Sequence, residues 1–206
     1  EFSCVWSDIF MMGSPSAEVG RPTGSSANED LHGVGLTEPF FISTTEITQS
    51  LYEQVMFYNP SQYSNCGEDC PVERVSWHEA AAFTNMMSQM EQLQECYSCT
   101  GIEEMLDADD EDRADVARDI VCAHLENPYS CEGYRLPTEA EWEMVARSGS
   151  SHAFWTPTGG AEIAENVLPT SELMCNTSIP FALSDGTILG EYSWHCANNP
   201  QAATGQ

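Results

Sequence analysis

The sequence contains no lysine, and its permanent positive charge rests on six arginines. Thirty-three acidic residues bring the formal net charge at pH 7 to −27. Such a chain cannot neutralise nucleic-acid phosphates and is repelled by an anionic membrane, so we expect neither partner. Purely apolar runs cover only a few residues, whereas a membrane-spanning helix needs about 20, so no membrane insertion is expected. Mutual repulsion between copies predicts a monomer.

Several familiar signatures are also missing. The chain opens Glu1-Phe2-Ser3-Cys4, without an initiator methionine or the basic region of a signal peptide, as expected of a processed chain or a fragment. There is no glycine-rich phosphate loop, no His-Glu-x-x-His and no Gly-x-Ser-x-Gly, so nucleotide binding, zinc-protease and serine-hydrolase chemistry are not indicated. The length of 206 residues predicts a single domain.

Cysteine, by contrast, is abundant. Nine cysteines stand at positions 4, 66, 70, 96, 99, 122, 131, 175 and 196. They predict four disulfides and an extracytoplasmic location, whether periplasmic, cell-surface or secreted, with Cys4 unpaired or paired outside this chain. The short loops 66–70 and 122–131 suggest local bridges, although spacing alone does not determine the pairing. The alternative is zinc, because Cys66-x3-Cys70 and Cys96-x2-Cys99 have ligand spacing, but no compact quartet closes either site.

Local patterns predict short helices and few strands. Residues 39–44 favour a strand. Thr48 resembles the N-cap of a helix that ends at Asn59-Pro60. Ser76 and Glu79 form a capping box for a second helix, whose predicted inner face is Ala80, Phe83, Thr84, Met87 and Met90.

The second half of the chain begins with an acidic stretch. Residues 101–125 suggest one solvated helix with an inner face of Val116, Ala117, Ile120, Val121 and His124. A calcium loop at 107–118 is rejected, since the turn glycine is missing and Arg118 replaces the bidentate glutamate. Another capping box at 138–141 precedes a helix whose expected buried residues are Trp142, Val145 and Ala146.

Five motifs occur in a recognisable order. They are Phe10-Met11-Met12-Gly13-Ser14, Phe40-Phe41-Ile42-Ser43-Thr44-Thr45-Glu46-Ile47-Thr48, Asn59-Pro60-Ser61, Cys70-Pro71-Val72-Glu73-Arg74-Val75-Ser76-Trp77, and Gly133-Tyr134-Arg135-Leu136-Pro137-Thr138-Glu139-Ala140-Glu141-Trp142-Glu143. In order and spacing they resemble the formylglycine-generating enzyme, or sulfatase-modifying factor, family. The resemblance is nearest to its cysteine-rich, acidic, secreted bacterial members.

This resemblance implies an α+β fold of the formylglycine-generating-enzyme type, related to C-type lectins, with little regular secondary structure and disulfide staples. Residues 1–206 would form the N-terminal two-thirds of one such domain, incomplete at the C-terminus, with an acidic, cysteine-containing insertion at 101–130. The family implies structural calcium, for which Asn166 is the candidate ligand. Arg135 suggests a half-buried ion pair with a carboxylate, and Trp77 is expected to pack between a helix and a loop.

The family also implies copper-dependent oxidation of a sulfatase cysteine to formylglycine, with a sulfatase-like protein or peptide as substrate. The catalytic cysteine pair of the family lies beyond the segment present here, so no catalytic residue is assigned and this chain is expected to be inactive alone. Copper would be a cofactor only together with that pair. The alternative function is a secreted, non-catalytic, lectin-like module that binds a peptide, a glycan or a protein.

Overall fold

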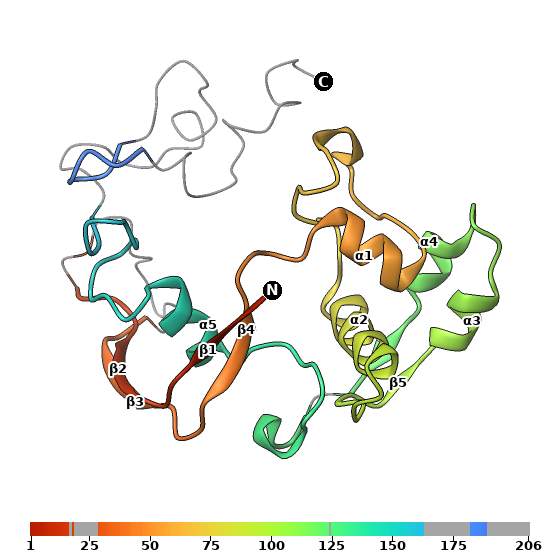
Figure 1. Cartoon of the computed structure of the whole chain (residues 1–206), viewed down its shortest axis with the longest axis horizontal. Coiled ribbons are helices and arrows are strands. Elements are labelled where there is room, and N and C mark those ends of the chain that lie inside the picture. The colour runs from red at the N-terminus through yellow and green to blue at the C-terminus, as the bar shows by residue number, and fades with distance from the viewer. Residues whose placement is uncertain (17, 19–28, 124, 163–181, 189–206) are drawn as a thin grey trace. The chain divides into compact units, whose positions relative to one another are not determined.

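The computed structural model describes residues 1–16, 18, 29–123, 125–162 and 182–188. The chain divides into two compact units, each taken by itself below: unit 1 contains residues 1–4 and 41–138, and unit 2 contains residues 5–40 and 139–206. Figure 1 labels the helices and most strands. No helix in the described ranges is long and apolar enough to cross a membrane.

Short elements separated by loops make up both units (Figure 1). Unit 1 holds most of β1 (Phe2–Val5) and β4 (Phe40–Ser43), then α1 (Gln49–Met56), η1 (Ser64–Cys66), α2 (Trp77–Met90), β5 (Cys99–Thr100), α3 (Ile102–Asp107), α4 (Arg113–Ala117), β6 (Val121–Cys122) and η2 (Pro128–Ser130). Unit 2 holds β2 (Ile9–Met12), β3 (His32–Gly35) and α5 (Glu139–Ala146). In the described ranges, the strands form three two-stranded ladders, β1–β4, β2–β3 and β5–β6. The predicted α+β class and the strand at 39–44 are confirmed.

Helix α1 begins as the sequence predicts. The Thr48 hydroxyl accepts a hydrogen bond from the Leu51 amide (3.2 Å), one of the amides that a helix leaves without a partner in its own backbone. The helix ends earlier than Asn59-Pro60, because Phe57 adopts the left-handed conformation at φ 64°. Its amide donates to the Glu53 carbonyl oxygen (2.8 Å) and closes the last turn.

The capping box of α2 is confirmed. Ser76 Oγ accepts from the Glu79 amide (3.1 Å), and Glu79 Oε2 accepts from the Ser76 amide (2.8 Å). The predicted inner face is only partly right: Phe83 and Thr84 are buried, whereas Met90 is 64% exposed. Because α2 contacts both α1 and β6, its buried arc is wider than one stripe and includes Ala81, Ala82, Asn85, Met86 and Ser88.

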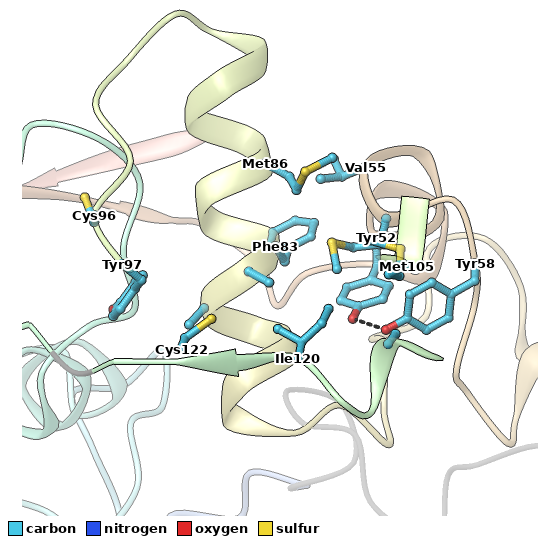
Figure 2. Close-up of a cluster of buried hydrophobic side chains, with 14 residues drawn as sticks. Tyr52, Val55, Tyr58, Phe83, Met86, Cys96, Tyr97, Met105, Ile120 and Cys122 are labelled. Atoms are coloured by element: carbon cyan, nitrogen blue, oxygen red, sulfur yellow. Dashed lines mark hydrogen bonds between the residues drawn. The ribbon is translucent and has the colours of Figure 1, made fainter. Parts of the chain in front are cut away.

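The hydrophobic core of unit 1 forms around α2 (Figure 2). Tyr52 of α1 stacks on Phe83 of α2, with ring centroids 5.3 Å apart and planes inclined by 8°. The acidic stretch also reaches this core, since Met105, Ala117 and Ile120 are each 1% exposed or less. Residues 101–130 therefore share the core of α1 and α2, while their carboxylates stay largely at the surface.

One buried amide side chain joins α2 to the loop before β5. Asn85 Oδ1 accepts from the amides of Cys96 (3.1 Å) and Tyr97 (3.0 Å), and Asn85 Nδ2 donates to the Tyr97 carbonyl oxygen (2.7 Å). Asn85 is fully buried, so water cannot replace these partners readily. Gly133 packs directly on the Gln94 carbonyl of the same loop, where any Cβ would overlap it.

The single helix expected at 101–125 is wrong. The chain forms α3, turns, forms α4 and then enters β6, where Val121 is 56% exposed. The Arg113 guanidinium stabilises this turn by donating to the carbonyl oxygens of Met105, Ala108 and Phe57, at 3.3, 2.9 and 3.2 Å. These contacts come from the tertiary fold and leave no periodic signal. His124 lies outside the described residues.

Within the described residues there are three disulfides, Cys66–Cys70, Cys96–Cys131 and Cys99–Cys122. The predicted 66–70 bridge and the unpaired, exposed Cys4 are confirmed. The suggested 122–131 bridge is wrong, because the β5–β6 ladder places Cys99 opposite Cys122. The zinc alternative for 66, 70, 96 and 99 is also wrong, since all four sulfurs are in disulfides. Cys175 and Cys196 lie outside the described residues.

Unit 2 joins two of the sequence motifs. The Gly13 amide donates to Glu143 Oε1 (2.8 Å), and Arg147 Nη2 donates to the Gly13 carbonyl oxygen (3.1 Å). Arg147 Nε also lies 2.9 Å from Glu143 Oε1. Gly13 has φ 89°, and an added Cβ would lie 2.7 Å from the Asp30 carbonyl oxygen, so only glycine fits here.

The orientation predicted for α5 is wrong. Trp142 is 62% exposed, Ala146 is exposed and Val145 is half-buried, whereas Glu141 is fully buried. Hydrophobic periodicity assigns the largest apolar side chain to the inner face. Here that face includes a carboxylate and the Glu143–Arg147 pair, which apolar periodicity cannot reveal.

Candidate functional site

A polar pocket of about 220 Å³ lies in unit 1, between the first turns of α1 and the loop around η1. It is open to solvent, and apart from one glycine every residue that lines it has a polar side chain. The lining residues are Gln49, Ser50, Glu53, Asn59, Ser64, Asn65, Gly67 and Glu68. Such a pocket suits a polar group of a ligand rather than an apolar one.

The pocket is built around the buried side chain of Gln49, which is 3% exposed. Gln49 Nε2 donates to the carbonyl oxygens of Tyr63 and Pro71, each at 3.3 Å, and Gln49 Oε1 accepts from Asn59 Nδ2 (2.9 Å). With donors and acceptor engaged, Gln49 links α1 to both flanking loops. It gives the pocket a fixed wall.

Two of the sequence motifs meet at this wall. Asn59 Oδ1 accepts from the Ser61 amide (3.0 Å), and Ser61 Oγ accepts from the Glu73 amide (3.2 Å). Glu73 Oε1 in turn accepts from the Tyr63 amide (2.8 Å). The Asn59-Pro60-Ser61 motif and the motif that begins at Cys70 therefore act together, as a hydrogen-bonded frame for the pocket.

The disulfide loop 66–70 forms the opposite side and also caps α1. The Cys70 carbonyl oxygen accepts from the Gln49 amide (2.8 Å), and the Glu68 carbonyl oxygen accepts from the Ser50 amide (3.2 Å). These are the first two amides of α1, which find no partner within a helix. The loop that contributes Gly67 and Glu68 to the pocket is thus bonded to the helix that contributes Gln49, Ser50 and Glu53.

The charge of the pocket favours a cation. Glu53 and Glu68 line it, and none of its lining residues is arginine, lysine or histidine. A positively charged group placed between the carboxylates would be attracted by both. In the parts of the chain that the structure describes, no three His, Cys, Asp or Glu side chains lie together in an arrangement that could hold a metal ion.

On the core side of α1, three side chains form a buried chain of hydrogen bonds. The hydroxyls of Tyr52 and Tyr58 lie 3.0 Å apart, and Tyr58 donates to Glu79 Oε1 (2.8 Å). Figure 2 marks the bond between the two tyrosines. Burial, above all, raises the pKa of both phenols, and the neighbouring Glu79 carboxylate raises them further.

These shifts predict a loss of stability in alkali. An unfolded tyrosine ionises near pH ~10, whereas Tyr52 and Tyr58 keep their protons in the folded chain well above that value. Their contribution is complete below pH ~10 and falls as pH rises further, by about 1.4 kcal/mol per pH unit for each tyrosine. Urea unfolding at several pH values should show a shallower fall for Tyr58→Phe, whereas Tyr129→Phe, which alters a 42% exposed ring, serves as control. Identical slopes in wild type and Tyr58→Phe would contradict the assignment.

Other residues that the sequence analysis selected have mixed outcomes. Asn166 lies outside the described residues, so the calcium ligand stays a prediction. Trp77 packs edge-to-face on Tyr97 of the adjoining loop, with centroids 5.6 Å apart, as expected. Arg135 donates to the Leu136 carbonyl oxygen (3.1 Å) and lies 5.6 Å from the centroid of the Tyr129 ring, and its ion pair stays a prediction.

Sequence reasoning did not identify Gln49 or the Tyr52–Tyr58–Glu79 chain. Gln49 directly follows the Thr48 cap, and nothing in a single sequence distinguishes a buried glutamine at that position from a surface one. The tyrosines did carry a weak signal. Leu51, Tyr52, Val55 and Met56 recur at helical spacing, which places Tyr52 on an apolar helix face, and a buried phenol normally has a hydrogen-bond partner.

Comparison with known proteins identifies the family to which this chain belongs. A family model described as the sulfatase-modifying factor enzyme 1-like domain matches residues 10–181, and the chain belongs to this family. A stretch of 120 residues is 36% identical to the chaperone protein LppX of Paenibacillus barcinonensis, and it covers 58% of this chain and 40% of that protein.

A solved structure supports the same fold. Treponema denticola variable protein 1 superposes with a TM-score of 0.53 at 24% identity, over 74% of this chain and 54% of that one. A structure titled CarF has a TM-score of 0.45 at 25% identity, over 72% of this chain and 57% of that one. This chain therefore spans about half the length of the relatives it matches. The predicted formylglycine-generating-enzyme fold is confirmed.

Proposed function

We propose that this chain is a non-catalytic, polypeptide-binding module of the sulfatase-modifying factor family, which works outside the reducing cytoplasm. Its polar pocket would receive a basic side chain of the partner. The observation that carries the proposal is the pocket itself. Glu53 and Glu68 line a solvent-open cavity whose wall is fixed by Gln49 and the motif residues around it.

The disulfides support the proposed location outside the reducing cytoplasm. Six of them form three disulfides, and such bonds persist in oxidising surroundings rather than in a reducing cytosol. The relative from P. barcinonensis is named a chaperone protein, and a chaperone role here would likewise require binding of another polypeptide. The net charge of −27 would draw basic partners towards the chain over a range set by salt.

Oxidation of a sulfatase cysteine is the second candidate, and family membership favours it. Copper(I) requires soft ligands such as thiolates. In the described ranges every cysteine except Cys4 is in a disulfide, so these ranges offer no thiolate pair. We expect the 206-residue chain, supplied with copper, oxygen and a sulfatase-derived cysteine peptide, to form no formylglycine by mass spectrometry. Turnover would establish the oxidase instead.

The binding proposal is tested by titrating the ¹⁵N-labelled chain with N-acetyl-lysine methylamide and with its norleucine counterpart at ~150 mM salt. We expect amide shifts centred on residues 49–53, 59 and 64–68 with the lysine compound only. The double variant Glu53→Gln/Glu68→Gln should weaken binding by about fivefold or more, since it removes both pocket charges.

The matched control is Glu103→Gln/Glu104→Gln, which removes the same net charge from the exposed first turn of α3. It should leave the affinity within about twofold, because long-range attraction between exposed charges is screened. Equal weakening in both double variants would mean that only the overall charge attracts lysine. Amide shifts spread evenly over the chain would also contradict binding of lysine in the pocket.

A further inference from the structure

The three disulfides of the described ranges differ in whether they belong to the hydrophobic core of unit 1. Cys96 and Cys122 belong to the hydrophobic core cluster, and their partners Cys131 and Cys99 pack against it. Neither Cys66 nor Cys70 is part of that cluster. The Cys66–Cys70 bridge closes a loop between residues only four apart, whereas the other bridges join residues 35 and 23 apart. Opening it would therefore release little of the core.

The same bridge has a direct connection to the pocket. Gly67 and Glu68 lie inside the closed loop, and Ser64 and Asn65 immediately precede it, so four of the eight lining residues depend on the position of this loop. The carbonyl oxygens of Glu68 and Cys70 accept the first two amides of α1. A loop that moved would lose these bonds and separate the two sides of the pocket.

We infer that the Cys66–Cys70 disulfide is a redox-sensitive strap. The oxidised bridge keeps the two sides of the pocket in place, and reduction of the bridge lets them separate. A dithiol is the chemical class of reductant. One of its thiolates attacks the sulfur of Cys66, which is half-buried, whereas Cys70 is 5% exposed. The Cys66–Cys70 bond breaks and a mixed disulfide forms.

The second thiolate of the reductant then displaces Cys66, so that the reductant leaves as a cyclic disulfide. Two electrons and two protons end on Cys66 and Cys70 as two thiols. The expected loss of lysine binding on reduction rests on the proposed function. The redox sensitivity of the Cys66–Cys70 bridge does not depend on that function. Core residues such as Tyr52 and Phe83 would stay packed, since the other two bridges remain closed.

The experiment treats the folded 206-residue chain with increasing dithiothreitol, alkylates the free thiols and identifies the modified cysteines by peptide mass spectrometry. Hydrogen exchange is read on the same samples. We expect Cys66 and Cys70 to be alkylated at about tenfold lower dithiothreitol than Cys96, Cys99, Cys122 and Cys131. Exchange at the Gln49 and Ser50 amides should accelerate about tenfold or more, while amides in the middle of α2 keep their protection.

The double variant Cys66→Ser/Cys70→Ser should reproduce the fast exchange without reductant, and Cys96→Ala/Cys131→Ala should not reproduce it selectively. Opening of the core bridges at the same dithiothreitol, or unchanged exchange at Gln49 and Ser50, would overturn the strap. The binding titration keeps the two proposals apart. No lysine binding in the oxidised chain rejects the proposed function alone, whereas lysine binding that survives selective reduction rejects the redox control.

Discussion

Replacement of Asn85 by alanine should lower the free energy of unfolding by about 3 to 5 kcal/mol, as measured by urea or thermal unfolding. The side chain is fully buried and satisfies two backbone amides and one carbonyl of residues 96 and 97. Truncation leaves these three groups without partners in a place that water reaches poorly, and each unsatisfied group costs about 1 to 3 kcal/mol. Partial relaxation of the loop keeps the total below the simple sum.

Asn85→Asp is the informative control. Its carboxylate still accepts from the amides of Cys96 and Tyr97, but it has no hydrogen to donate to the Tyr97 carbonyl oxygen. It should be destabilising because a buried charge is added, with a loss that shrinks as pH falls and the carboxyl becomes protonated. Thr84→Val, one residue earlier on α2, should cost much less than Asn85→Ala. Comparable losses at both positions would contradict the bridging role of Asn85.

Removal of both core disulfides should have an even larger effect. Cys99–Cys122 lies inside the loop that Cys96–Cys131 closes, so the two bridges are nested around the acidic stretch. In the chain-entropy model each bridge alone contributes about 3.5 to 4 kcal/mol, and the pair contributes about 6 kcal/mol because the inner bridge shortens the loop that the outer bridge closes. The quadruple alanine variant should therefore be largely unfolded at room temperature by circular dichroism, since domains are commonly stable by only about 5 to 15 kcal/mol.

The comparison is Cys66→Ala/Cys70→Ala, whose five-residue loop is worth about 2 kcal/mol at most in the same model. This variant should remain folded with near-native ellipticity. A quadruple variant that melts within a few degrees of the wild type would show that hydrophobic packing, rather than the nested bridges, maintains unit 1.

The parts of the fold that follow from neighbouring residues could be predicted from the sequence. Thr48 caps α1, and Ser76 with Glu79 caps α2, because a cap needs only a side chain and amides two or three residues away. The 66–70 bridge belongs to the same class. Its two cysteines are too close in sequence for the fold to separate them far.

The parts that depend on distant residues could not be predicted. Cys122 pairs with Cys99 because a strand ladder forms, and the Arg113 guanidinium donates to the carbonyl oxygen of Phe57, which is 56 residues away in the sequence. Trp142 is exposed while Glu141 is buried, which reverses the order that hydrophobicity assigns. Burial of a carboxylate is costly unless other groups form hydrogen bonds or ion pairs with it, and the fold determines which groups lie close enough to do so.

The candidate pocket was only partly visible in the sequence. Asn59-Pro60-Ser61 and the segment from Cys70 to Glu73 stood out as family motifs, and both contribute to its frame. Their convergence on Gln49 is a property of the three-dimensional fold, and so is the fact that Glu53 and Glu68 line the same pocket. The motifs therefore indicated where the chain is constrained, and the structure shows that the constraint shapes a cavity.

The nested bridges have a consequence for cleavage of the chain. The two candidate trypsin sites within the acidic stretch, after Arg113 and Arg118, both lie between Cys99 and Cys122. A cut at either position leaves fragments joined by two covalent links, with Met105 on one piece and Ile120 on the other still held in the same core. Nicked molecules would migrate near the intact protein on a non-reducing gel and separate only after thiol treatment, so proteolysis at this surface need not release any part of unit 1.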